Sequence, residues 1–146
     1  MVYSFLNVSF LLAGPGLAVN LGAGAAVAEE GIEIEPASEK NKMDIGADGS
    51  GQHTLLADDS ATVKVTLLKT SPFNAVLQAA YDLQSSTSAL WGQNIGTVVD
   101  TARGDTTVLQ VGAFHHKPKL VYKKSAEFME WNFDFVKHTT VLGAGQ

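Results

Sequence analysis

Residues 61–94 read ATVKVTLLKTSPFNAVLQAAYDLQSSTSALWGQN, and within them the periodicity changes from that of a strand to that of a helix. Over residues 61–68 small or apolar side chains alternate with mostly polar ones, which is the pattern of a half-buried β-strand. Ser71 then supplies a capping hydroxyl, and Pro72 suits the first helical position, where no N–H is needed. Apolar residues at helical spacing follow, so the stretch predicts a helix over about 71–85, the only convincing helix in the chain.

The two faces of this predicted helix differ in polarity. We expect one face to pack against the outside of a sheet, with Trp91 closing the end of that core. The side chains expected to be buried on this face are Phe73, Val76, Leu77 and Ala80. The opposite face is expected to point outward, toward solvent or a partner, and carries Asn74, Gln78 and Asp82.

The composition fits a single domain spanning residues 1–146. Hydrophobic residues make up 45% of the 146 residues, which is enough for a real core. The absence of cysteine excludes disulfides and thiolate metal sites. A net charge of −5 argues against a protein that neutralises nucleic-acid phosphates. The 14 glycines indicate many turns, as short β-strands require.

The first 28 residues are interpreted as an N-terminal hairpin, with a strand over 2–12, a turn at 13–16 and a return over 17–21. Both faces of the first strand carry apolar groups, so the second face is covered either by a neighbouring subunit or by another layer of the same chain. A secretory signal ending at Ala26-Val27-Ala28 is the alternative. The lack of early Lys or Arg and the break at Gly14-Pro15-Gly16 count against it.

The remaining segments alternate or turn in ways typical of antiparallel strands. Residues 31–51 are expected to form an extended loop for contact between subunits. Segments 95–101 and 106–114 flank a turn and predict a hairpin. Residues 127–141 give the clearest alternation, with Trp131, Phe133 and Phe135 on one face. The predicted fold is therefore mainly β, a barrel or sandwich of antiparallel strands with one flanking helix.

No group of residues in the sequence predicts catalysis, a metal site or a cofactor site. The histidines lack metal-binding spacing, and the Asp44–Gly49 segment lacks the alternating acids of a calcium loop. The glycine runs complete no dinucleotide fingerprint, and no serine lies in a nucleophile elbow. One basic cluster is present, which we interpret as a salt-bridge patch between subunits: Lys117, Lys119, Lys123 and Lys124. The pattern predicts a structural protein and not an enzyme.

Several segments, taken in order, resemble the tail-tube structural proteins of contractile-tailed bacteriophages. No single segment is a catalytic signature, and the likeness rests on their collinear order over nearly the whole chain. The segments are YSF at 3–5, AEEGI at 28–32, MDIGADG at 43–49, LLKTSP at 67–72, YD at 81–82, ALWGQN at 89–94 and EWNFD at 130–134.

The resemblance implies a β-barrel or sandwich whose six copies form a ring, with rings stacked into a hollow tube inside a sheath. It implies as partners the chain itself, the sheath, the tape-measure protein, and baseplate and tail-terminator proteins. Viral DNA would pass through without specific binding, no membrane would be involved, and the virion tail would assemble in the host cytoplasm. An acidic lumen suits DNA passage, because like charges repel. The candidate lumen residues are Glu33, Glu35, Glu130 and Asp134.

Three alternatives remain open from the sequence. Related tubes occur in contractile bacteriocins and type VI secretion, which the same segments would fit. A small secreted β-sandwich that binds a partner through its glycine-rich loops is a second possibility. A hydrolase whose Ser, His and acid meet only in the folded chain is a third, since sequence spacing does not reveal such a site.

Overall fold

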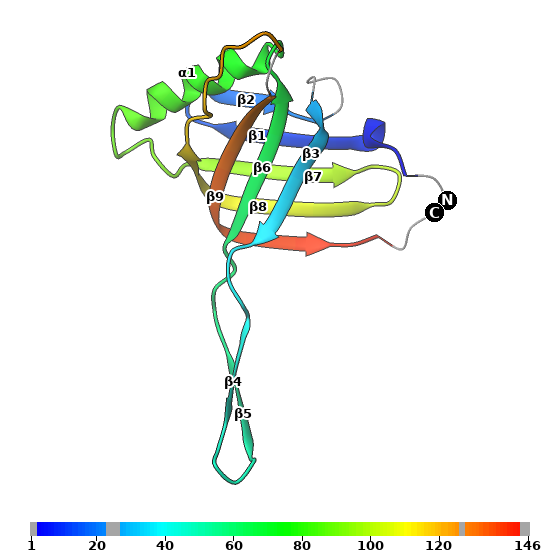
Figure 1. The fold of residues 1–146 in the computed structure, drawn as a ribbon, viewed down its shortest axis with the longest axis vertical. Helices are drawn as coiled ribbons and strands as arrows, with labels where there is room; N and C mark the ends of the chain where they lie inside the picture. Colours follow the sequence, from blue (N-terminus) through cyan, green and yellow to red (C-terminus); the bar gives the residue numbers. More distant parts are fainter. Residues whose placement is uncertain (1–2, 23–26, 126–127, 144–146) are drawn as a thin grey trace.

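The computed structural model describes residues 3–22, 27–125 and 128–143, and these form a strongly curved sheet, one α-helix and a long projecting hairpin (Figure 1). The predictions for Val2, Ala26 and Glu127 lie outside the described residues. The elements, in chain order, are a 3₁₀ turn at Phe5–Asn7, β1 Val8–Gly14, β2 Leu17–Asn20, β3 Val27–Pro36, β4 Asn41–Ile45, β5 Gly51–Leu55, β6 Ala61–Leu68, α1 Phe73–Ser85, β7 Asn94–Asp100, β8 Asp105–His116 and β9 Phe128–Val141.

Seven strands form one antiparallel sheet in the order β2-β1-β7-β8-β9-β6-β3. The sheet turns through β9, because this long strand pairs with β6 over residues 128–135 and with β8 over residues 132–141. In Figure 1, β3 and β6 run along the long axis while β1, β7 and β8 cross it. The prediction of a mainly β fold with one flanking helix is confirmed.

The curved sheet and α1 enclose one hydrophobic core. Strands β1, β2, β6, β8 and β9 each contribute at least one apolar side chain that is almost fully buried. The largest are Trp131, Phe10, Phe133 and Phe135, none more than 1% exposed. From α1 the core takes Leu77 and Ala80, at 0% and 1% exposed. The alternation of β9 thus places its aromatic residues inward and its polar residues outward.

The helix buries Leu77 and Ala80 as predicted, but Asn74 takes the buried position expected for Val76. Asn74 is only 8% exposed, whereas Val76 is 37% exposed, and Phe73 is half-buried. Trp91 is 36% exposed and packs edge-on against Tyr81, so it covers the rim of the core and does not fill it. The helix begins at Phe73, with Pro72 as its N-cap residue.

Asn74 is buried because it satisfies polar groups that the core would otherwise leave unpaired. Its Oδ1 accepts a hydrogen bond from Trp131 Nε1 at 3.0 Å. Its Nδ2 donates to the carbonyl oxygens of Leu68 and Lys69, at 3.0 and 3.3 Å, where β6 ends. The amide therefore joins the helix to two strands, and this need for hydrogen bonds outweighs the polarity of the residue.

Replacing Asn74 with alanine is expected to lower the free energy of unfolding by about 3 kcal/mol, because the buried Trp131 indole N–H loses its partner and the Leu68 and Lys69 carbonyls each lose one donor, although the Leu68 carbonyl keeps the Ser71 N–H. The matched control is Gln78→Ala, which removes an exposed bond to Asp82 and should change stability by less than about 0.5 kcal/mol. Urea denaturation of both variants measures the difference. Equal stabilities would show that the Asn74 bonds contribute nothing.

The N-terminal hairpin is shorter than predicted. Phe5–Asn7 forms a 3₁₀ turn in place of the predicted strand, because the Ser4 hydroxyl and carbonyl accept the N–H groups of Leu6 and Asn7. The strand begins at Val8, and Pro15-Gly16 forms the turn to β2. A buried amide pair holds this turn to the helix. Gln84 exchanges two 2.9 Å hydrogen bonds with Asn94 and donates to the Pro15 carbonyl.

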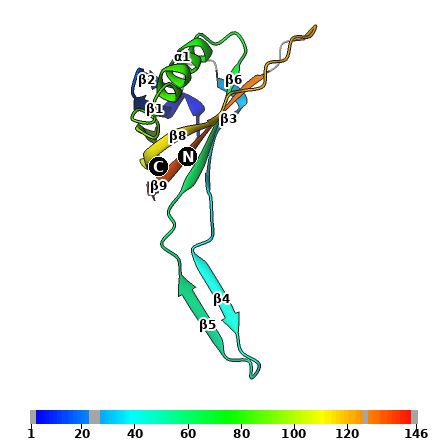
Figure 2. The same ribbon diagram turned by 90° about the vertical axis from the view of Figure 1, so that its left-hand side faces the viewer.

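The predicted extended loop over residues 31–51 is wrong at its beginning. Residues 31–36 continue β3, in register with β6 from Ile32↔Val65 to Pro36↔Ala61, because Ile32 and Ile34 pack against the core. Beyond them β4 and β5 form a separate two-stranded ribbon. Figures 1 and 2 show this hairpin extending well away from the body, along the long axis.

Polar contacts join the two segments that connect the hairpin to the sheet, residues 37–40 and 56–60. Lys40 pairs with Asp59 at 2.7 Å, and Leu56 N donates to the Lys40 carbonyl. The Ser38 hydroxyl donates to Asp58, and this bond is the main reason why the pKa of Asp58 falls to about 2. The Asp58 carboxylate thus forms a hydrogen bond across the two segments that join the hairpin to the sheet.

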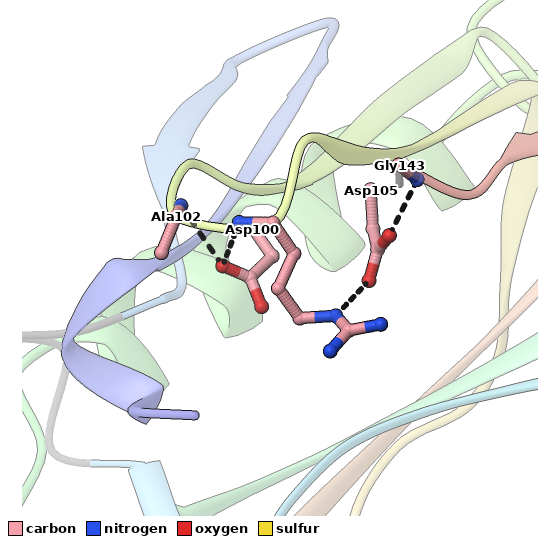
Figure 3. A network of polar contacts seen from close by, with 5 residues as sticks. Asp100, Ala102, Asp105 and Gly143 are labelled. Atoms are coloured by element: carbon pink, nitrogen blue, oxygen red, sulfur yellow. Dashed lines mark hydrogen bonds and ion pairs between the residues drawn. The ribbon is translucent and has the colours of Figure 1, made fainter. Parts of the chain in front are cut away.

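A second polar network lies where β7 turns into β8 (Figure 3). Asp100 accepts from the N–H groups of Ala102 and Arg103. Arg103 Nε donates to Asp105 at 3.1 Å, and Asp105 accepts from Gly143 N at 2.8 Å. Gly143, shortly after β9, is thereby held against the β7–β8 turn.

Candidate assembly surfaces

The four candidate lumen acids lie on one face of the sheet. Strand pairing sets Glu35 beside Thr62 and Asp134, and sets Glu130 beside Thr66. Since residues paired across antiparallel strands share a face, all four acids point away from the core. We call this surface the acidic face; its acidic members are Glu33, Glu35, Glu130 and Asp134, all exposed.

Two cations partly offset the charge of the acidic face. Lys64 pairs with Glu130 at 2.7 Å, and His115 Nδ1 lies 2.7 Å from Asp134. His115 carries a charge only when protonated. Exposed pairs of this kind contribute at most about 1 kcal/mol each. The four acids therefore outnumber the two groups that pair with them.

The outer surface of the crossing strands is different in character. Leu11, Thr97 and Val108 are in register across β1, β7 and β8, on the side opposite the core. Leu11 is 54% exposed, and Ile95, on the same face, is 55% exposed. This apolar surface on strand β1 matches the expectation that both faces of the first strand carry apolar groups.

The projecting hairpin also has an apolar side. Pairing of Met43 with His53 and of Asn41 with Leu55 places Met43, Ile45 and Leu55 on one face of the ribbon. These three side chains are 57%, 59% and 83% exposed. An isolated two-stranded hairpin is marginally stable in water, so a ribbon with a bare apolar face needs a surface to pack against.

Residues 117–124 form a second projection, which we call the basic arm; Figure 2 shows it at the end of the molecule opposite the hairpin. The Lys69 ammonium group holds the arm to the end of β6. It donates a hydrogen bond to the Val121 carbonyl and lies 4.0 Å from the centre of the Tyr122 ring. Lys117 lies 3.8 Å from Asp82 of α1, so this lysine interacts with its own subunit.

A pocket of about 500 Å³ opens at the base of the basic arm, which we call the arm pocket. Its lining combines apolar side chains, cationic groups such as Lys119, the Thr66 hydroxyl and the Glu130 carboxylate. The residues are Thr66, His116, Lys119, Val121, Lys123, Phe128 and Glu130. Thr66 is 2% exposed, and its hydroxyl has no hydrogen-bond partner among the described residues. Sequence reasoning missed this pocket, because Thr66 looks like an ordinary strand residue.

The histidines do not come together at a metal site. His115 and His116 are ring neighbours at 5.0 Å, while His53 contacts Asn41 and His138 contacts the Asp59 carbonyl. Within residues 3–22, 27–125 and 128–143, no group of three His, Asp or Glu could hold a metal ion. In the same part of the chain no helix is long and apolar enough to cross a membrane.

Solved structures with a similar fold come from contractile injection systems. A sheath/tube terminator of the extracellular contractile injection system PVC has a TM-score of 0.55 at 10% identity and covers 97% of each chain. The PVC sheath-tube complex gives 0.54 at 7% identity, covering 91% of this chain and 88% of the other. The tube-terminating cap of the anti-feeding prophage gives 0.53 at 7% identity, covering 92% and 88%. These identities establish the fold alone.

Sequence comparison identifies the family. A search of curated protein sequences finds no match. The family model described as "Bacteriophage PhiTE tail tube protein" matches residues 1–143, which is almost the whole chain. Together with the curved antiparallel sheet and single flanking helix, this match means that the chain belongs to a family of phage tail tube proteins.

Proposed function

We propose that this chain is the structural subunit of the hollow inner tail tube of a contractile phage. Six copies form a ring, and rings stack into the tube. The acidic face lines the lumen, and DNA passes along it during ejection. The observation that carries this proposal is that Glu33, Glu35, Glu130 and Asp134 share one face of the β3-β6-β9 layer.

The edges of the sheet support closure of the ring. β3 and β2 are the first and last strands of the seven-stranded sheet, so each has one side without a partner strand in the described chain. Unpaired strand edges favour pairing with another chain, and a closed barrel removes them. The hairpin supports stacking, because it projects along the long axis and carries an exposed apolar side.

The same proposal assigns the partners and location of the protein. The tube surface away from the lumen contacts the sheath, and the ends contact the baseplate and terminator proteins. The lumen holds the tape-measure protein before DNA enters. Assembly takes place in the host cytoplasm, and the protein has a structural role and no catalytic one. Family membership favours a phage tail over the tube of another contractile system.

Reversing a charge on the acidic face tests whether this face lines the lumen. Glu35→Lys should fold and form tubes of normal length, because Glu35 is exposed and pairs with Thr62. Phage carrying it should eject DNA more slowly, since cations in the lumen attract phosphates. We expect the rate constant of DNA ejection to fall by about tenfold.

The control for this test is Asp82→Lys, the same change of charge on the exposed side of α1. It should leave ejection at the wild-type rate, because α1 lies in the layer away from the acidic face. Equal ejection by the Glu35→Lys and wild-type phages would contradict the lumen assignment. Equal slowing by both variants would contradict it as well.

A further inference from the structure

The hairpin and the basic arm project from opposite ends of one layer. β6 runs from Ala61, next to the hairpin stalk, to Leu68, next to the arm (Figures 1 and 2). When identical subunits stack head to tail, the surface at one end of each copy must fit the different surface at the other end of the next. In such a stack along the long axis, the hairpin of one copy would face the arm of its neighbour.

The tip of the hairpin is small and carries one charge. Residues 46–50 read GADGS, and Asp48 is the charged member. Asp48 Oδ1 accepts hydrogen bonds from the Ser50 hydroxyl and N–H, and these bonds lower the Asp48 pKa. The tip thus presents a fixed anion, surrounded by residues small enough to enter a pocket.

The arm pocket has the complementary properties. Its volume of about 500 Å³ lies within the range of ligand-binding clefts. Lys119 supplies a cation, and Val121 and Phe128 supply apolar walls. The acid in the lining, Glu130, is paired with Lys64 at 2.7 Å. The Thr66 hydroxyl is buried without a partner among the described residues, and an unpaired buried hydroxyl is costly unless something binds it.

We propose that the arm pocket is the socket for the hairpin tip of a second copy in the adjoining ring, with the Asp48 carboxylate entering beside Thr66 and Lys119. This inference rests on the proposed function, because it needs stacked rings, and it names the joint between them. The apolar side of the hairpin then packs along the Leu120, Tyr122 and Phe128 side chains, which are 59%, 80% and 46% exposed.

Charge exchange between the two surfaces tests the joint. The purified full-length chain is assembled, and electron microscopy counts single rings and stacked tubes. Asp48→Lys and Lys119→Asp should each reduce the yield of tubes by about tenfold or more while rings still form, because like charges then face each other. The double variant Asp48→Lys/Lys119→Asp should restore most of the tubes. Glu39→Lys, an equal charge change before the hairpin, should stack normally.

The Thr66→Val variant separates this role from a structural one. Valine keeps the shape of threonine and removes the unpartnered hydroxyl, so the free subunit should be as stable as wild type or more stable. Stacking should nevertheless weaken, because the carboxylate loses its partner in the socket. A variant that stacks as well as wild type would remove Thr66 from the joint.

Other outcomes would also overturn the inference. If Asp48→Lys stacks normally while Lys119→Asp does not, the pocket binds a partner other than the hairpin tip. If the double variant stacks no better than the single ones, the two side chains do not meet. Wild-type protein that stacks into tubes, together with Asp48→Lys and Lys119→Asp variants that stack equally well, refutes the joint alone. Wild-type protein that never forms rings refutes the proposed function, and the inference with it.

Discussion

Replacing Leu77 with aspartate is expected to prevent folding. Leu77 is 0% exposed and lies in the middle of the face of α1 that joins the core. The change removes apolar packing worth about 2–5 kcal/mol and places a carboxylate where no partner is available. A domain of this size is stable by only about 5–15 kcal/mol, so the loss approaches the whole free energy of unfolding. Circular dichroism and an NMR spectrum of the purified variant measure the outcome.

The neighbouring change Gln78→Asp is the matched control. Gln78 is half-buried and bonds to Asp82 one turn later, at 3.0 Å. An aspartate there repels Asp82 and costs about 0.2–0.5 kcal/mol, so the variant should fold and at most disturb assembly. If both variants fold and form normal tubes, the position of α1 on the sheet is wrong.

The second large effect is expected at Gly112, where β7, β8 and β9 lie side by side. Gly112 is paired with Asn94 on one side and Phe135 on the other. A Cβ atom at this position would lie 2.2 Å from Phe135 Cε1, and Phe135 is itself only 1% exposed. Because a buried ring cannot move aside freely, Gly112→Val should lower the free energy of unfolding by about 3 kcal/mol or more.

Chemical denaturation measures this loss, and a second substitution checks its cause. Gly112→Ala combined with Phe135→Leu should be more stable than the sum of the two single changes predicts, because the smaller side chain leaves room for the new methyl. Gly51→Ala is the control, since its Cβ would make an ordinary 3.5 Å contact with Ile45. Strictly additive effects of the two core substitutions would contradict the steric explanation.

Periodicity predicted the elements that bury one face. β6 and β9 alternate because one side of each strand meets the core, and the β7–β8 hairpin follows from its turn. The same alternation placed Glu130 and Asp134 on the side away from the core, so that part of the acidic face was accessible from sequence. Their alignment with Glu33 and Glu35 required the register of β3 against β6, which no single strand reveals.

The polar residues of the helix show where periodicity fails. Asn74 and Gln84 are buried, at 8% and 0% exposed, while Val76 and Leu83 are 37% and 45% exposed. The helix is oriented by hydrogen bonds to Trp131, Asn94 and Pro15, which come from distant parts of the chain. Polarity alone cannot anticipate such partners, because a buried amide looks like a surface amide in the sequence.

The most direct test of the account is a cryo-EM map of the tube assembled from this chain. The account predicts stacked rings whose channel wall carries Glu33, Glu35, Glu130 and Asp134. A tube with all four acids on its outer wall, or a strict monomer at high protein concentration, would contradict it.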